Sequence, residues 1–280
     1  MEWVTEPFEL GFQQRALLGG SLAAIALAVV GTWVVIRGMT FFGDALVHGV
    51  VPGIALAVLL DFDLMVGATL AAVVMIGGIS LVHRQTAFSE DTGIGLLFVG
   101  MLGLGVILIS KSDSFTGNLT SILFGDALGV TTGDIAVLAV VTAVVIAVSL
   151  VFHRHFLVLA FNEQKATLLG LRPGLAHAVL LGLVTIGVVG SFQTVGTLLV
   201  FGMLVGPPAT AALLVRRVPA MMLTAAGIGV ASVVIGLVVS YHVDTAGSAT
   251  IAVTPVVMFF VVLAVRSFRG GPAWTRTTGA

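Results

Sequence analysis

Charged residues are scarce in this sequence of 280 residues. Asp, Glu, Lys and Arg make up 9% of the chain, whereas a soluble domain carries about 25% because its water-facing surface needs them. Hydrophobic residues make up 58%, and the mean hydropathy is +1.18. The 12 basic and 13 acidic residues give a net charge of −1, which excludes electrostatic binding of nucleic acid. These values predict an integral membrane protein with several spans.

Cysteine is absent, which excludes disulfide scaffolds, thiolate metal sites and thiol catalysis. The phosphate-binding signature G-x-x-x-x-G-K-[ST] is absent too, because the only lysines, Lys111 and Lys165, follow Ser110 and Gln164. The sequence also contains neither H-E-x-x-H nor G-x-S-x-G. We therefore expect a protein that is not an enzyme.

Long uncharged runs organise the whole chain. A helix needs about 20 residues to cross a hydrocarbon core of about 30 Å, and the first fourteen residues lack the positive charge of a cleavable signal. We predict an all-α polytopic membrane protein, with residues 1–280 forming one transmembrane domain and no separate soluble domain. Nine spans are expected, roughly at 14–36, 41–60, 64–82, 93–110, 134–152, 175–193, 195–215, 219–240 and 248–265. The turns near 61–63 and 190–197 must be short.

The basic residues predict the orientation of these spans, because cytoplasmic loops retain Lys and Arg. With the N-terminus outside and nine crossings, ten of the twelve basic residues lie inside, and only Arg15 and Lys111 lie outside. Eight or ten spans would place basic residues on both sides. We expect a multi-pass protein of the bacterial cell membrane with its C-terminus in the cytoplasm.

The second predicted span holds an acid inside a hydrophobic run, which is costly unless it faces a partner or a wet cavity. Asp44 is followed four residues later by His48, so a helix places both side chains on one face. The pair could bind a divalent cation, join two helices structurally, or relay protons. Two ligands are too few for a tight site, so a weak transit site, or one completed by a second copy, is expected. Pro52 and Gly53 predict a kink or local unwinding just beyond.

Other polar positions carry weaker signals. His242 and Asp244 lie at the outer end of the eighth span and form a candidate external mouth for a cation, with a solvated loop as the alternative. The remaining histidines are expected to anchor or pack helices. Gly202 and Gly206 form a G-x-x-x-G pair that predicts a helix-packing seam.

The inside segment at 162–171 reads as a short amphipathic helix. Asn162 suits an N-cap, Glu163 suits the first turn, and Gly170 can end the helix before Pro173. Such a helix could lie on the bilayer surface, or it could insert into a groove of a soluble partner.

These residues resemble the permease subunits of zinc and manganese ABC importers, the ABC-3 family. GDALVHGVVPG at 43–53 is similar to the family signature G-D-[AS]-L-[SA]-H-x-x-L-P-G, and SILFGD at 121–126 resembles L-L-F-G-D. The segments at 161–171 and 207–211, and the tail at 240–250, resemble further family elements in the same order. The resemblance extends from about residue 15 to residue 265.

The resemblance implies a type II-like ABC importer permease that passes Zn²⁺ or Mn²⁺ inward as its transported substrate, with no permanently bound cofactor. Asp44 and His48 would be the transit ligands at the interface with a second permease copy. Two cytoplasmic ATPase subunits, an extracytoplasmic metal-binding protein and membrane lipid are the implied partners, and nucleic acid is not. The coupling helix to the ATPase would use Asn162, Glu163, Lys165, Leu168, Leu169 and Gly170.

This sequence departs modestly from the family pattern. Asn162 and Glu163 stand where Asp and Pro are common, and Val47 replaces a small residue. Pro207 precedes Pro208 as an addition that is expected to deepen a helix break in the seventh span. Two alternatives stay open, a siderophore or iron-chelate ABC permease and an ion-coupled secondary carrier that uses Asp44 as a proton or sodium site.

Overall fold

The regular secondary structure is entirely helical in the residues that the computed structural model describes, which are 2–85, 90–110, 129–161 and 172–268. A short N-terminal pair of helices precedes the long ones. The helices are α1 (Glu2–Thr5), η1 (Glu6–Glu9), α2 (Gly11–Ile36), α3 (Thr40–Gly49), α4 (Val51–Leu59), α5 (Leu64–Gln85), α6 (Glu90–Ile109), α8 (Thr132–Val151), α9 (His153–Phe161), α11 (Pro173–Val195), α12 (Thr197–Leu214), α13 (Val218–Val243) and α14 (Gly247–Phe268).

The predicted spans correspond to helices of this bundle. Within the described ranges, eight helical stretches are long and apolar enough to cross a membrane, and α12 contributes a shorter apolar helix. The second stretch, Thr40–Leu59, consists of α3 followed by α4. The prediction of an all-helical polytopic membrane protein is confirmed.

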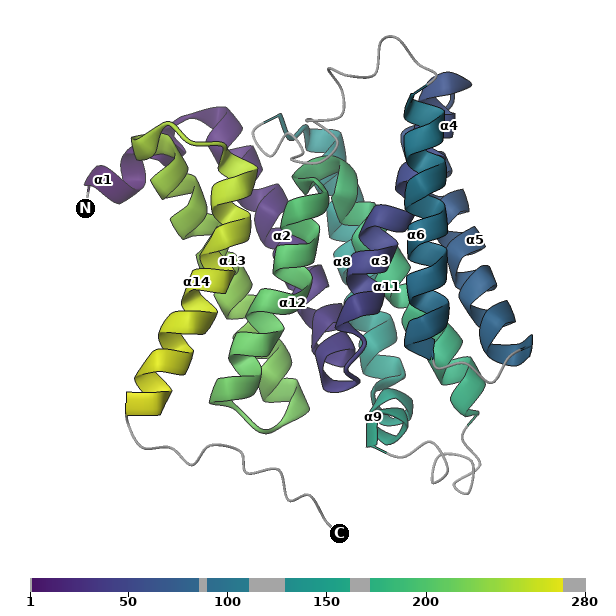
Figure 1. The fold of residues 1–280 in the computed structure, drawn as a ribbon. Helices are drawn as coiled ribbons and strands as arrows, with labels where there is room; N and C mark the ends of the chain where they lie inside the picture. Colours follow the sequence, from purple (N-terminus) through teal and green to yellow (C-terminus); the bar gives the residue numbers. More distant parts are fainter. Residues whose placement is uncertain (1, 86–89, 111–128, 162–171, 269–280) are drawn as a thin grey trace.

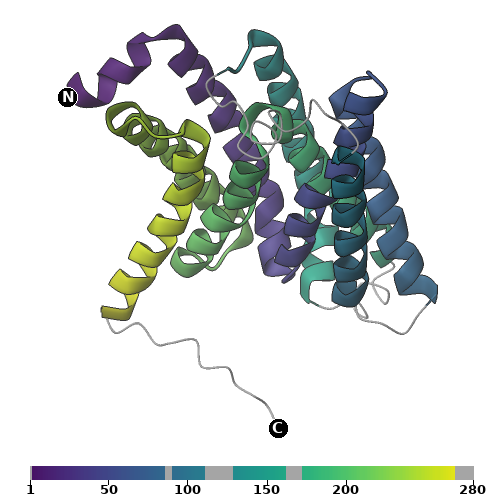
Figure 2. The ribbon, with the colours of Figure 1, turned by 45° about the horizontal axis from the view of Figure 1, so that its top comes forward.

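The helices α2 and α12 lie at the centre of the bundle (Figures 1 and 2). Helix α2 packs against α8, α11, α12 and α13, and α14 covers α12 and α13. Helices α4, α5 and α6 pack together on the opposite side, with α3 between them and the centre (Figure 1). The N-terminal helix and the last turn of α14 lie at opposite ends of the bundle (Figure 1).

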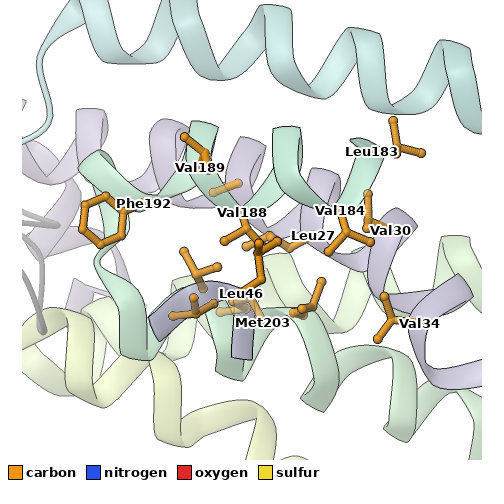
Figure 3. Close-up of a cluster of buried hydrophobic side chains, with 14 of the residues drawn as sticks. Leu27, Val30, Val34, Leu46, Leu183, Val184, Val188, Val189, Phe192 and Met203 are labelled. Carbon is orange, nitrogen blue, oxygen red and sulfur yellow. The ribbon is translucent and has the colours of Figure 1, made fainter. Parts of the chain in front are cut away.

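The core lies where α2, α3, α11 and α12 meet (Figure 3). Leu46 of α3 is fully buried among Leu27, Val188 and Met203, which come from the other three helices. Since successive residues of a helix are about 100° apart, positions two residues from Leu46 face away from this core. The burial of Leu46 thereby turns Asp44 and His48 toward the α6 side of α3.

Three short connections shape the ends of the helices. Helix α3 ends at Gly49 and α4 begins at Val51, so the break lies at Val50, while Pro52 and Gly53 are in the first turn of α4. Gly196 alone joins α11 to α12 and adopts φ 77°, which glycine accepts without strain. Between α4 and α5, the Asp63 carboxylate accepts hydrogen bonds from the N–H groups of residues 65 and 66. Both turns that the sequence predicts to be short are short.

The two prolines of α12 do not end the helix, which corrects the expected break in the seventh span. Pro207 and Pro208 lie inside a helix that continues to Leu214. Because Pro208 has no N–H, it cannot donate to the carbonyl of Leu204. That carbonyl instead lies where a side chain on Gly31 of α2 would be. Helix α2 therefore approaches α12 closely at the level of the lost hydrogen bond.

Glycines allow several helix pairs to approach closely. Gly202 and Gly206 face Ala252 and Pro255 of α14, where an added Cβ would meet atoms at 3.0 and 2.9 Å. The packing seam predicted from the G-x-x-x-G pair is therefore confirmed. Inside a bilayer the lipid is itself apolar, so burying apolar surface between helices gains little free energy. Close backbone contact is therefore a main source of helix association there.

We expect Gly53→Ala to destabilise the bundle. A Cβ at Gly53 would fall on the carbonyl oxygen of Gly67 in α5, and backbone cannot move aside cheaply. Overpacking of this kind costs about 1–3 kcal/mol, measured as a loss in the free energy of unfolding in mixed detergent micelles. Gly77→Ala is the matched control, because nothing lies within 4 Å of its added Cβ. Equal stability of the two variants would contradict the close α4–α5 crossing.

Candidate functional site

Asp44 and His48 lie on one face of α3, as their spacing predicts. The Asp44 Oδ1 atom is 3.6 Å from His48 Nε2. The Asp44 side chain is 31% exposed and that of His48 is 33% exposed. A carboxylate and an imidazole facing lipid would be costly, so within a membrane this face needs a covering that carries polar groups or water.

Aromatic rings from α3 and α6 frame this pair. Phe98 of α6 lies edge-to-face with His48 and with Phe41, and each pair of ring centroids is 6.0 Å apart. Phe41, Asp44 and His48 follow one another at spacings of three and four residues, so they form a single stripe on α3. Neither Phe41 nor Phe98 is predicted from the sequence to lie at this site. The spacing could have revealed Phe41, but nothing in the sequence links Phe98 to this site.

The end of α3 follows the site directly. Gly49 lies against the buried sulfur of Met75 from α5, which leaves no room for a larger residue. Pro52 has no N–H to donate to the carbonyl of His48, and the helix restarts at Val51. The chain therefore changes direction within one turn of the imidazole.

A single chain supplies two ionisable ligands here. Among the described residues, no group of three or more His, Asp or Glu side chains is placed to hold a metal ion. A carboxylate and an imidazole are ligand types that Mn²⁺, Fe²⁺ and Zn²⁺ all accept. The arrangement suits transient contact with a cation, and any further ligands must come from water or from another chain.

His242 lies in the last turn of α13 and Asp244 directly follows that helix, whereas Asp44 lies in α3. The His242 ring stacks on Trp3 with centroids 4.1 Å apart, and His242 Nε2 donates to the Trp3 carbonyl at 2.8 Å. Asp244 ends α13 in the left-handed conformation with φ 51°. His242 thus holds the N-terminal helix with one nitrogen, and only Nδ1 is left to face a ligand.

Two other histidines, His153 and His177, contact neighbouring helices. Arg37 Nη1 at the end of α2 donates to His177 Nδ1 at 3.0 Å, and His153 lies edge-on to Trp33. Trp33 itself donates to Ser149 Oγ at 2.9 Å, so α2, α8 and α9 meet there. The predicted coupling helix at 162–171 and the segment 121–126 lie outside the described residues.

The fold and the site define a class of protein, a polytopic membrane transporter with an acid and a histidine inside one span. Comparison with known proteins identifies the family. Residues 9–266 match the model of the ABC 3 transport family, ABC-3. This chain belongs to the ABC-3 family and is the membrane permease subunit of an ABC importer of metal ions.

Two curated relatives span nearly the same length. The manganese transport system membrane protein MntC of Listeria innocua is 34% identical over 253 residues, which cover 90% of each chain. The probable iron transport system membrane protein of Haemophilus influenzae is 32% identical over 268 residues, covering 96% of this chain and 98% of the relative.

Two solved structures share the fold. PsaBC from Streptococcus pneumoniae in complex with Fab aligns with a TM-score of 0.83, at 30% identity over 94% of each chain. An inward-facing putative metal-chelate type ABC transporter aligns with a TM-score of 0.75 over 90% of this chain and 85% of that one. The second is 15% identical, so it supports the type II permease fold alone.

The family settles several expectations. The resemblance read from the sequence is confirmed, and an ABC permease does not itself hydrolyse ATP, as expected for a chain that is not an enzyme. A secondary carrier is excluded by the same finding.

We expect His242→Ala to loosen the N-terminal helix. The substitution removes the ring stack on Trp3 and the hydrogen bond to its carbonyl. Cleavage by a glutamyl endopeptidase after Glu6 and Glu9 should accelerate about three- to tenfold, since two contacts of this kind oppose local opening. Trp3→Phe keeps an aromatic ring and the carbonyl, and it should accelerate cleavage less. An unchanged cleavage rate in His242→Ala would show that the contacts between His242 and Trp3 do not hold the N-terminal helix in place.

Proposed function

We propose that this permease imports Mn²⁺ and that Asp44 and His48 are the ligands that receive the ion within the membrane. The observation that carries the proposal is an acid and a histidine 3.6 Å apart on a membrane-spanning helix, each about one third exposed. Relatives named for manganese transport favour this ion. Iron is the second candidate, favoured by the relative named for iron transport.

A second permease copy would complete the site. The Asp44 and His48 face is incomplete as a metal site in one chain, because two protein ligands hold a transition metal weakly. It is also too exposed to face lipid. A second copy related by a two-fold axis would present the same face, double the ligand set and enclose a polar path between the copies.

Two further partners would deliver the ion to the permease and supply the energy for its transport. An extracytoplasmic binding protein would dock on the end of the bundle that carries Trp3 and Asp244, where His242 Nδ1 and the Asp244 carboxylate form a secondary candidate contact for the incoming ion. A cytoplasmic ATPase dimer would contact the opposite end through residues 162–171. Movement of that segment would pass to α9, which packs on Trp33 of α2 through Phe156.

The orientation proposed is N-terminus outside and C-terminus in the cytoplasm of the cell membrane. The connections at one end of the bundle hold Arg37, Arg172, Arg216 and Arg217, whereas those at the other hold Asp61, Asp63 and Asp244 (Figure 1). Basic residues favour the cytoplasmic side. The acidic rim would raise the local concentration of cations outside.

We expect Asp44→Ala and His48→Ala each to reduce manganese uptake at least about tenfold, because each removes one of two protein ligands. The measurement is ATP-dependent uptake of radioactive Mn²⁺ into proteoliposomes that contain the permease with its ATPase and binding protein. Fe²⁺ and Zn²⁺ compete in parallel samples and identify the preferred ion.

Asp91→Ala is the matched control, since Asp91 is an exposed acid in the first turn of α6, two turns before Phe98. It should retain wild-type uptake. Wild-type uptake in Asp44→Ala and His48→Ala, at equal protein levels and with intact ATPase assembly, would overturn the transit-site proposal. Preferred uptake of Fe²⁺ would replace manganese as the substrate and leave the site in place.

The absence of cysteine makes the orientation directly testable. Single substitutions Ala246→Cys, between α13 and α14, and Arg216→Cys, between α12 and α13, introduce the only thiols of the chain. A membrane-impermeant maleimide applied to intact cells should label Ala246→Cys, and it should label Arg216→Cys only after permeabilisation. The reverse pattern would invert the proposed orientation, and labelling of both in intact cells would contradict a membrane crossing by α13.

A further inference from the structure

We propose that Phe98 of α6 is a positioning residue that orients the His48 imidazole for the cation and so sets the affinity of the transit site. This inference rests on the proposed function of Asp44 and His48. It assigns to α6, a separate span, the control of a ligand on α3. The supporting observations are ring geometry, the length of the contact between Asp44 and His48, and the packing of α6 on α3.

Asp44 does not by itself fix the imidazole. The separation of 3.6 Å between Asp44 Oδ1 and His48 Nε2 is too long for a hydrogen bond. In the described part of the chain, the other side-chain interaction that the structure gives His48 is with Phe98. A histidine ring that lacks a hydrogen bond is free to rotate about two side-chain torsions. The orientation of the His48 ring is therefore set by the side chain packed against it.

Phe98 is positioned to set the orientation of the His48 ring. Its ring lies at 66° to the His48 ring and at 65° to the Phe41 ring, with both centroids 6.0 Å away. Edge-to-face geometry of this kind is the favoured arrangement of two rings. Because Phe41 and His48 are seven residues apart on one stripe of α3, Phe98 bridges two successive turns, and Asp44 lies between them.

The bridge is anchored in the protein. Phe98 is half-buried and packs against the main apolar core together with its neighbour Leu97. Helix α6 contacts both α3 and α4, on either side of the break at Val50. A fixed ring at this place lowers the entropy that the imidazole loses on binding a cation, so affinity is gained without an additional ligand.

A double-mutant cycle in Mn²⁺ binding tests the role of Phe98. The wild type, Phe98→Leu, His48→Ala and the double variant are purified with the ATPase subunit in lipid nanodiscs. The electron paramagnetic resonance signal of free Mn²⁺ then gives the dissociation constant. Phe98→Leu should weaken binding about 2- to 12-fold, the range of an aromatic pair. In the His48→Ala background the same substitution should weaken binding less than twofold, because its target is gone.

Two further variants separate positioning from general packing. Phe98→Tyr keeps the ring and should bind Mn²⁺ within about twofold of the wild type. Phe260→Leu, at an exposed position of α14, makes the same substitution away from the site and should also bind like the wild type. Thermal unfolding of each complex checks that all variants are folded.

The possible outcomes separate the positioning role of Phe98 from the ligand roles of Asp44 and His48. Equal weakening by Phe98→Leu in both backgrounds, or no weakening in either, would overturn the positioning role while His48 remains a ligand. Failure of Phe98→Tyr to bind like the wild type would overturn it as well. Wild-type Mn²⁺ binding by His48→Ala and Asp44→Ala would overturn the proposed function itself, and the positioning role with it.

Discussion

The cost of placing an ionisable group inside a membrane is the constraint on which the rest of this structure depends. Asp44 and His48 lie on a helix that has to cross the bilayer, and lipid offers them no hydrogen bonds. The burial of Leu46 in the core turns the pair toward α6. Their one-third exposure leaves a face that a partner chain or water has to cover. The polar pair therefore supports both the proposed transit site and the proposed partner copy that covers it.

Close packing by small residues provides the framework around this pair. Gly53 and Gly67 bring α4 and α5 together until their backbones touch, and Gly31 lets α2 cross α12 beside the carbonyl of Leu204. In lipid such contacts replace the hydrophobic effect as the source of helix association.

Much of the fold follows from the sequence because a membrane limits the choices. Runs of apolar residues predict helices, and the positions of the helices agree with them, including the short turns at Gly196 and beside Asp63. The spacing of Asp44 and His48 also predicts that they share a face. The break at Val50 lies just beyond His48, where Pro52 and Gly53 predict a kink, because Pro52 disturbs the hydrogen bonds of the turn that precedes it.

The sequence by itself determined the class of protein, the positions of its apolar helices and the placement of Asp44 and His48 on one helix face, because these depend on hydropathy and on helical periodicity. Tertiary structure decided which helix faces the pair, and it brought Phe98 to His48 from a different span. It also engaged His242 with Trp3, residues that lie at opposite ends of the chain. Contacts of this kind depend on how helices pack, and the period of a single helix carries no information about its neighbours.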